Sequence, residues 1–220
     1  MLGQMAAGIT HELNQPLAAL ITLSDNSIKL LDMTRTEDVR DNLRITRQLA
    51  DRMGRIVGQL KVFARKGQAQ LEVVSVGDAL SNSLLLIEPR RREHDVEIDI
   101  RQPETPVFVV ADSIRLEQVL VNLLRNAIDA METAADKRVT VHVELRAGEV
   151  LIRVRDRGAG IASESLPHLF EPFYTTKPIG KGLGLGLAIS LAIVRSFGGE
   201  LSATNASDGG AEFDIVLNAA

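Results

Sequence analysis

The segment from residue 39 to residue 64 carries two apolar stripes, and a helix with two such stripes needs more than one neighbour. The first stripe alternates spacings of four and three residues, the pattern of a coiled-coil seam. Its members are Val39, Leu43, Thr46, Ala50, Met53, Val57, Leu60 and Ala64. The second is formed by Ile45, Leu49, Ile56 and Phe63. One neighbour is the helix expected over residues 3–32, and two such hairpins from two chains would form a four-helix bundle.

From about residue 72 the chain alternates strands and helices instead. Period-two patterning predicts strands at 96–100, 139–145, 150–154 and 212–217. Helices are expected at about 76–90, 112–132 and 184–197, with Asp112 or Ser113 as the N-cap of the middle one. The chain is therefore predicted to be α+β, with an antiparallel helical hairpin over residues 1–70 and an α/β sandwich over residues 71–220.

Composition narrows the class of protein. The chain is 45% hydrophobic and 25% charged, as in an ordinary globular protein. Its net charge of −4 argues against nucleic acid as a ligand, and its one dense basic run, Arg90-Arg91-Arg92, is expected to be a solvated helix end. The absence of cysteine indicates a reducing compartment. No apolar stretch approaches the roughly 20 residues that cross a bilayer. Because the sequence starts abruptly inside a helical pattern, we expect it to be a piece of a longer protein.

Several polar or glycine-rich motifs follow in order along the chain. His11 and Glu12 lie early in the first helix. Far downstream, Asn122 and Asn126 are four residues apart, which places both amides on one helix face. An amide oxygen is a suitable Mg²⁺ ligand. A pair of surface asparagines is an equally good interpretation of that spacing alone.

Two glycine-containing loops accompany the asparagine pair. Asp156-Arg157-Gly158-Ala159-Gly160 follows a strand, where a carboxylate could accept a hydrogen bond from an exocyclic amine. By itself this motif also fits a simple turn. Glycines at 182, 184 and 186 open a helix and could leave its backbone N–H groups free to bind phosphates, a pattern that packing explains poorly. Between the loops, a mobile segment is expected, with Phe170 and Phe173 as hydrophobic latches.

This series of motifs resembles the ATP-binding catalytic domain of sensor histidine kinases, whose fold recurs in type II topoisomerases, mismatch-repair ATPases and a heat-shock chaperone family. The hairpin with His11-Glu12 resembles the dimerisation and histidine-phosphotransfer domain of the same kinases. The resemblance covers nearly the whole chain. The run from Gln4 to Leu20 looks most like the C4-dicarboxylate transport sensor kinases.

The resemblance implies a role for each motif. His11 would attack the γ-phosphate of ATP, with Glu12 orienting the imidazole or taking its proton. Asn126 would bind Mg²⁺, Asn122 would lie at the metal-phosphate region, and Asp156 would bind the adenine amine. The remaining residues expected to contact nucleotide are Asp129, Gly158, Gly160, Ile161, Thr175, Thr176, Lys177, Gly182, Leu183, Gly184, Leu185 and Gly186.

Three positions depart from the commoner family pattern. Gln15 stands where many relatives carry Thr or Asn, which puts phosphatase activity toward the regulator in doubt. Asp129 stands where many have a basic residue, so one phosphate contact is lost and Lys177 gains importance. Leu183 stands where many have Thr, which removes a hydroxyl from the edge of the lid.

The resemblance also implies partners and a setting. The chain is expected to form a homodimer and to pass its phosphoryl group to the receiver domain of a response regulator, one that belongs to a transcriptional activator. It would be the cytoplasmic portion of a membrane-bound bacterial receptor. Two other kinds of protein would share part of this pattern. An ATPase of the same fold would need a glutamate at position 122 to activate water. A non-catalytic dimeric scaffold would not need the intact His11, Asn126, Asp156 and glycine-rich loop.

Overall fold

The computed structural model describes residues 2–64, 70–177 and 184–220. Within the first two helices it describes only the backbone for residues 2–12, 52, 55, 56 and 58–64. The chain divides into two compact units, Met1–Lys66 with Thr175–Leu185, and Gly67–Tyr174 with Gly186–Ala220. Each unit is treated in turn.

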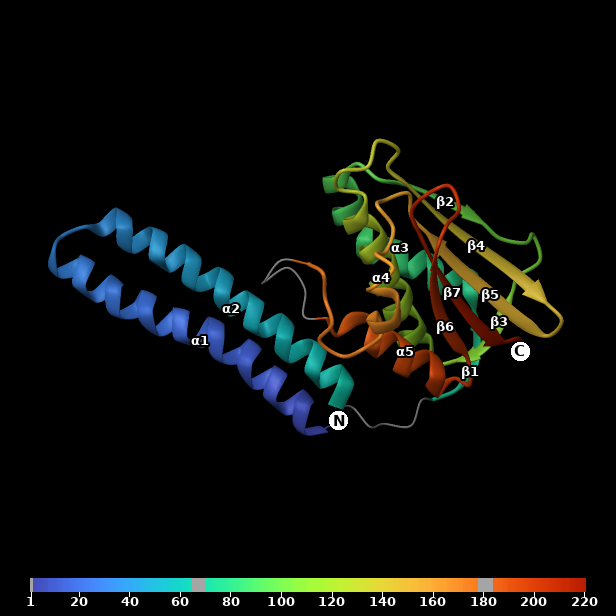
Figure 1. Ribbon diagram of the computed structural model, residues 1–220, viewed down its shortest axis with the longest axis horizontal. Coiled ribbons are helices and arrows are strands. Elements are labelled where there is room, and N and C mark those ends of the chain that lie inside the picture. Colours follow the sequence, from blue (N-terminus) through green and yellow to red (C-terminus); the bar gives the residue numbers. More distant parts are fainter. Residues whose placement is uncertain (1, 65–69, 178–183) are drawn as a thin grey trace. The chain divides into compact units, whose positions relative to one another are not determined.

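Helices α1 (Leu2–Asp32) and α2 (Thr36–Ala64) form an antiparallel hairpin (Figure 1), as the sequence predicted. Buried and half-buried side chains recur along both helices at spacings of three and four. They are Leu13, Pro16, Leu20, Leu23, Ser27 and Leu30 on α1, and Val39, Asn42, Thr46, Leu49 and Met53 on α2. A polar pair lies within this seam, where Asn42 Nδ2 donates to Ser27 Oγ at 3.2 Å.

A separate row of apolar side chains, the exposed stripe, also runs along the hairpin. It is not the second stripe predicted from the sequence. On α1 it consists of Leu17, Ile21, Ile28 and Leu31, each between 45% and 58% exposed. On α2 the exposed members are Leu43, Ala50 and Val57. The first stripe predicted from the sequence is therefore split, since Val39, Thr46 and Met53 belong to the buried seam. Helix α2 has α1 as one neighbour within the hairpin. The exposed stripe is an apolar face that a second neighbour could cover.

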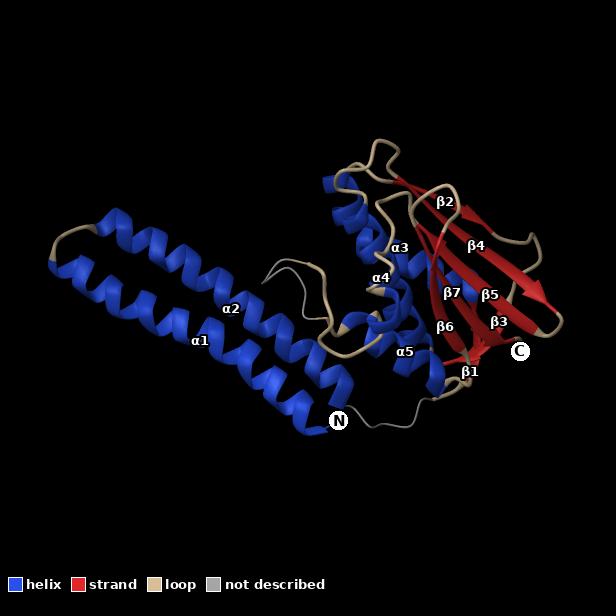
Figure 2. Ribbon diagram, viewed as in Figure 1, coloured by secondary structure: helices blue, strands red, loops and turns tan. Residues whose placement is uncertain are grey.

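The second unit is built on a five-stranded sheet with the order β2-β4-β5-β7-β6 (Figure 2). Strand β2 is parallel to β4 and the other pairs are antiparallel. The bounds are β2 Glu97–Arg101, β4 Arg138–Arg146, β5 Glu149–Arg155, β6 Glu200–Asn205 and β7 Ala211–Asn218. A separate antiparallel pair joins β1 (Glu72–Ser75) to β3 (Phe108–Ala111).

Three helices cover one face of this sheet: α3 (Val76–His94), α4 (Ser113–Ala130) and α5 (Gly186–Ser196) (Figure 2). A short 3₁₀ turn, η1, spans Leu166–His168. Alternate residues of the central strands point inward, and Leu120, Leu124 and Ile128 of α4 are fully buried against them. Removing these apolar side chains from water is the main force that holds α4 to the sheet. The opposite face is polar and includes a two-pronged ion pair between Arg153 and Asp214, with both distances 2.7 Å.

Most element boundaries agree with the sequence patterns. Asp112 is the N-cap of α4, and its carboxylate accepts the N–H of Arg115 at 3.1 Å. Helix α3 runs four residues past its predicted end at residue 90, to a left-handed cap at Asp95. Strands β1, β3 and β6 were not predicted. Among the described residues, no helix combines the length and apolarity needed to cross a membrane.

Candidate functional site

The exposed edge of helix α4 carries Asn122, Asn126 and Asp129, which share one face at spacings of four and three. Both asparagines are half-buried. Asn122 is fixed by helix α5, because its Nδ2 donates to the buried Ser190 Oγ at 2.9 Å. A Cβ at Gly186, the first residue of α5, would overlap Asn122 Oδ1. The start of α5 therefore lies directly against the asparagine face.

This contact corrects part of the sequence interpretation. We expected packing to explain the glycines at 182, 184 and 186 poorly, but packing against Asn122 requires glycine at position 186. Gly184 has a φ of +64°, a backbone conformation that favours glycine. Gly182 and Leu183 lie outside the described residues.

Asp156 follows β5 directly and is only 2% exposed. Its Oδ1 accepts two backbone hydrogen bonds, from Gly158 N at 2.9 Å and from Ala211 N at 3.1 Å. Burial raises the pKa of this carboxyl, and the two backbone hydrogen bonds oppose that shift. Both hydrogen bonds involve Oδ1, so Oδ2 is the oxygen that this geometry offers to a ligand donor.

The loop after Asp156 lies against the end of α4. A Cβ at Gly158 would overlap the backbone carbonyl oxygen of Ala130, so glycine is required there by the helix itself. Gly160 has a φ of +74°. Ile161, the next predicted contact, is half-buried and bonds to Asn205 of β6 through both its N–H and its C=O. The asparagine face of α4 and the Asp156 loop are thus brought together within one unit.

Asp129 has a partner that the sequence interpretation missed. Arg90 of α3 donates to Asp129 Oδ1 from Nε at 2.8 Å and from Nη2 at 2.5 Å. The basic run that we expected to be solvated is therefore mostly engaged. Its other two arginines donate to Glu88 and, with those hydrogen bonds as the main cause, lower the pKa of Glu88 to about 2.

The segment between the two loops is described as far as residue 177. Thr175 and Thr176 are exposed, and the backbone N–H of Lys177 donates to Thr175 Oγ1 at 3.1 Å. Lys177 is half-buried, and the backbone hydrogen bond to Thr175 is not its only interaction. Leu185 is 2% exposed.

Among the predicted hairpin residues, His11, Glu12 and Gln15 all lie within helix α1. The side chains of His11 and Glu12 are outside the described part of the chain, and Gln15 is exposed. Pro16 is buried inside the helix. Because proline has no N–H, the Glu12 carbonyl lacks its usual helical donor one residue after His11.

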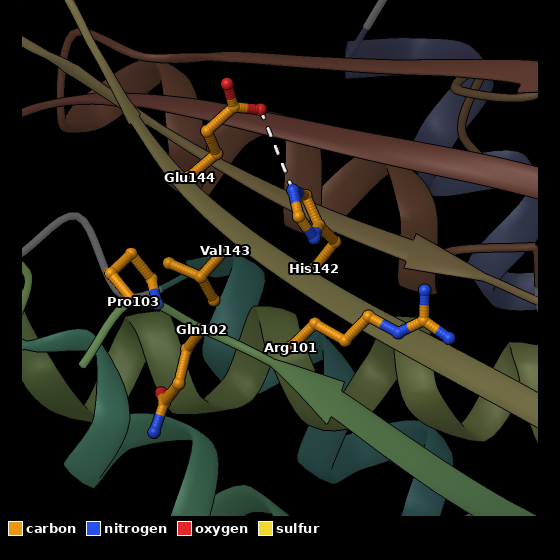
Figure 3. Close-up of a pocket in the computed structure, with 6 residues that line it drawn as sticks. All are labelled: Arg101, Gln102, Pro103, His142, Val143 and Glu144. Carbon is orange, nitrogen blue, oxygen red and sulfur yellow. Dashed lines mark ion pairs between the residues drawn. The ribbon is translucent and has the colours of Figure 1, made fainter.

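A cavity of about 480 Å³ lies elsewhere, at the edge formed by β2 and β4 (Figure 3). Its lining consists of Arg101, Gln102, Pro103, His142, Val143 and Glu144. His142 Nε2 lies 3.7 Å from Glu144 Oε2. None of these residues belongs to the motifs described above, so the cavity is separate from the α4 face.

Comparison with known families accounts for both units. Residues 111–220 match the family described as histidine kinase-, DNA gyrase B- and HSP90-like ATPase. Residues 1–69 match the His Kinase A phospho-acceptor domain. The chain belongs to the sensor histidine kinases. Its predicted fold class is thereby confirmed, and ATP is the nucleotide implied by the first of these families.

Individual relatives agree with this assignment. The chain is 44% identical over 217 residues to the C4-dicarboxylate transport sensor protein DctB of Pseudomonas aeruginosa, covering 98% of this chain and 36% of that protein. It is 36% identical to DctB of Rhizobium meliloti, covering 95% and 33%. The chain thus spans about a third of the length of these relatives. A crystal structure of the histidine kinase ThkA with the response regulator protein TrrA matches with a TM-score of 0.77 at 24% identity, covering 100% of this chain and 62% of that one.

The site geometry fits an adenine nucleotide on independent grounds. A nearly buried carboxylate whose Oδ1 already accepts two N–H groups is suited to accept one more from an exocyclic amine. Among the described residues, no group of three His, Asp or Glu side chains could hold a metal ion. An amide such as Asn126, together with phosphate oxygens, is a ligand set that Mg²⁺ accepts.

Sequence reasoning missed Arg90, Ser190 and Asn205. Arg90 carried a signal, since it stands in the one dense basic run while Asp129 follows the asparagine pair on the same face of α4. Ser190 lies one turn after Gly186, which could have indicated the same face of α5. Asn205 had no signal of its own, because its contact depends on how β6 is placed beside the Asp156 loop.

The raised pKa of Asp156 predicts a pH-dependent affinity for nucleotide. The carboxylate form accepts the amine, so affinity should fall as pH is lowered through that raised pKa, at a higher pH than an ordinary aspartate would cause. Asp156→Asn should weaken binding of a non-hydrolysable ATP analogue at neutral pH by about 10- to 100-fold, since a hydrogen bond to a charged group is lost. Calorimetric titration of both proteins across pH gives the ratio of affinities, which cancels protonation of the nucleotide itself.

For the free energy of unfolding, a raised pKa means that the folded protein holds the proton more tightly than the unfolded chain. Asp156 therefore favours folding at low pH, and that contribution is lost as pH rises through the raised pKa. If the ratio of nucleotide affinities of the wild-type and Asp156→Asn proteins does not change with pH, the assigned role of Asp156 is contradicted.

The Arg90–Asp129 pair predicts a specific pattern of rescue. Arg90→Ala removes a cationic partner from the Asp129 carboxylate, one turn beyond Asn126, so the KM for MgATP should rise by about three- to tenfold through stronger repulsion of the phosphates. Adding Asp129→Ala should restore most of that loss. Arg92→Ala is the matched control, since Arg92 is 75% exposed and bonds to Glu88. A double variant as weak as Arg90→Ala alone would contradict charge compensation.

Proposed function

We propose that this chain is the kinase core of a two-component sensor, which transfers the γ-phosphoryl group of ATP to His11 and then to an aspartate of a response regulator. The observation that carries the proposal is the buried Asp156 beside the α4 asparagine face, in a chain whose first 69 residues match a phospho-acceptor domain. We assign residues 1–70 to dimerisation and phosphotransfer and residues 71–220 to nucleotide binding.

The chemistry follows from the types of residue. A neutral imidazole nitrogen of His11 forms a bond to the γ-phosphorus, the bond to the bridging oxygen breaks, and ADP leaves. Glu12 takes the ring proton or orients the ring. In the second step the phosphoryl group passes from the imidazole to the carboxylate of an aspartate, and neutral histidine is restored. Gln15 lies one turn from His11, and because it replaces the commoner Thr or Asn, hydrolysis of the regulator's aspartyl phosphate is not part of this proposal.

The nucleotide site divides the binding task among its residues. Asp156 accepts the adenine amine, while Gly158, Gly160 and Ile161 shape the pocket around the ring. By their chemistry, the hydroxyls of Thr175 and Thr176, the ammonium of Lys177 and the backbone of the glycine-rich run are assigned to the phosphates. Mg²⁺, when bound by Asn126 and the phosphates, neutralises charge that develops on the transferred group.

The rival ATPase remains a weaker candidate. An ATPase of this fold would need a base at position 122 to activate water. Asn122 is an amide, and its Nδ2 is already committed to Ser190. An amide does not accept a proton near neutral pH, so hydrolysis by that route is disfavoured.

The partners and the setting follow from the relatives. ThkA was crystallised with a response regulator protein, which supports a receiver domain as the phosphoryl acceptor. The two DctB relatives are C4-dicarboxylate transport sensor proteins, and they support a place for this chain in the cytoplasmic part of a membrane receptor. The receiver domain would then belong to a transcriptional activator.

A labelling experiment tests the function. After incubation with γ-labelled MgATP, the wild-type chain should carry acid-labile, alkali-stable label, and His11→Gln should carry none. Asn126→Ala should lose Mg²⁺-dependent labelling because a metal ligand is missing. His168→Gln is the matched control, since His168 is exposed and paired with Glu171 at 2.9 Å.

Each other outcome identifies a rival. Phosphate released without label on the protein would support the ATPase. Neither label nor release would support the scaffold. Full labelling of Asn126→Ala would remove the assigned metal role while leaving His11 as the acceptor.

We also propose that the chain dimerises through the exposed stripe of the hairpin. Ile28 is 58% exposed within an apolar row of coiled-coil spacing, so Ile28→Glu would bury a charge in a four-helix bundle and should give monomers. Sedimentation of the full chain measures this. Leu85→Glu is the control, because Leu85 is 74% exposed on α3, outside the stripe. A dimer that survives Ile28→Glu would contradict this interface.

A further inference from the structure

The turn between β6 and β7 is bonded to the Asp156 loop at several points. The backbone N–H of Asp156 donates to the Ala211 carbonyl at 3.0 Å, and Ala211 N donates back to Asp156 Oδ1 at 3.1 Å. A Cβ at Gly210 would overlap the Asp156 carbonyl oxygen, so the two backbones touch there. The proximal side of the loop is therefore fixed by main-chain contacts.

The distal side of the same loop is held by one side chain. Asn205 Oδ1 accepts the backbone N–H of Ile161 at 2.7 Å, and Asn205 Nδ2 donates to the Ile161 carbonyl at 2.7 Å. A Cβ at Gly160 would lie 2.9 Å from Asn205 Oδ1, so the amide also fills the space beside that glycine. One primary amide thus satisfies both polar groups of one peptide residue.

Few side chains could replace this contact. The pair of bonds needs a donor and an acceptor at a fixed separation, which among side chains only asparagine and glutamine provide, and glutamine is one carbon longer. An aspartate would accept from the N–H but would face the carbonyl with a second acceptor. Gly160, the residue before Ile161, lies next to this amide and has a φ of +74°.

The turn that carries Asn205 is itself anchored. Ala206 N donates to the Gly210 carbonyl at 3.0 Å, which closes the turn. Arg155 of β5 pairs with Asp208 at its tip. The backbone N–H of Asp208 and the Arg155 guanidinium hold the pKa of that carboxyl below its usual value. Asn205 therefore acts from a rigid support.

We propose that Asn205 is a positioning residue for the adenine side of the nucleotide site. It holds Gly160 and Ile161 in the conformation that leaves Asp156 Oδ2 and the adjoining backbone able to meet an adenine ring. This inference rests on the proposed nucleotide site and adds to it a residue that contacts no phosphate. Its effect is confined to recognition of the base.

The test separates recognition of the base from recognition of phosphate. Asn205→Leu keeps the size of the side chain and removes both hydrogen bonds, and Asn205→Ala removes the side chain as well. Because Asn205 is exposed and water competes for both bonds, the Kd for a non-hydrolysable ATP analogue should rise by about tenfold. The inhibition constant of Mg–tripolyphosphate, which lacks the base, should stay at the wild-type value. The KM for ATP should rise with little change in kcat.

Asn218→Leu is the matched control, because Asn218 is an exposed asparagine at the end of β7 on the same sheet. Equal losses of ATP analogue and tripolyphosphate binding would indicate general damage to the fold and overturn the proposal, as would unchanged ATP affinity in both Asn205 variants. Failure of the proposed function is distinct, because the wild-type and Asn218→Leu chains would then also fail to bind ATP or to label His11.

Discussion

The proposed nucleotide face of this chain depends on one buried carboxylate. Asp156 is almost fully removed from water, and isolating a charge in that way is costly unless hydrogen bonds replace its hydration. Two backbone N–H groups do this, one from its own loop and one from the start of β7. The second of these bonds joins residues that are 55 positions apart in the sequence. The requirement to solvate one anion therefore fixes where the loop, the β6–β7 turn and the end of the sheet meet.

The glycines around the site have a related role. At 158 the close neighbour is the last carbonyl of α4, and at 186 it is the amide of Asn122. In both cases glycine lets two elements of the protein approach each other, and the surface for the ligand is a consequence of that approach. The glycines of the D-x-G-x-G motif and Gly186 at the start of α5 thus allow the close packing that brings Asp156, Asn122 and Asn126 onto one surface.

Much of the architecture was predictable because it depends on local periodicity. The hairpin follows from spacings of three and four, and β4, β5 and β7 follow from strict alternation of apolar residues. Strands β1 and β3 are four residues long, too short for alternation to be recognised, and they are defined by pairing with each other. The continuation of α3 beyond residue 90 ends at the cap at Asp95, whose N–H bonds to the carbonyls of Arg91 and Arg92, a contact that helix propensity does not reveal.

Within the site, residue types were predictable and their partners were not. Asp129 illustrates why. Taken alone, an acidic residue next to the proposed phosphate site removes a favourable contact, and the basic run at residues 90–92 does not show which arginine reaches it. Helices α3 and α4 pack in register, which brings Arg90 to that carboxylate and cancels its charge where it would oppose the nucleotide. The acidic residue at position 129 is thus made tolerable by a contact that only the packing of two helices creates. The role of Asn205 likewise depends on a tertiary contact, because its amide bonds to Ile161, which is 44 positions away in the sequence.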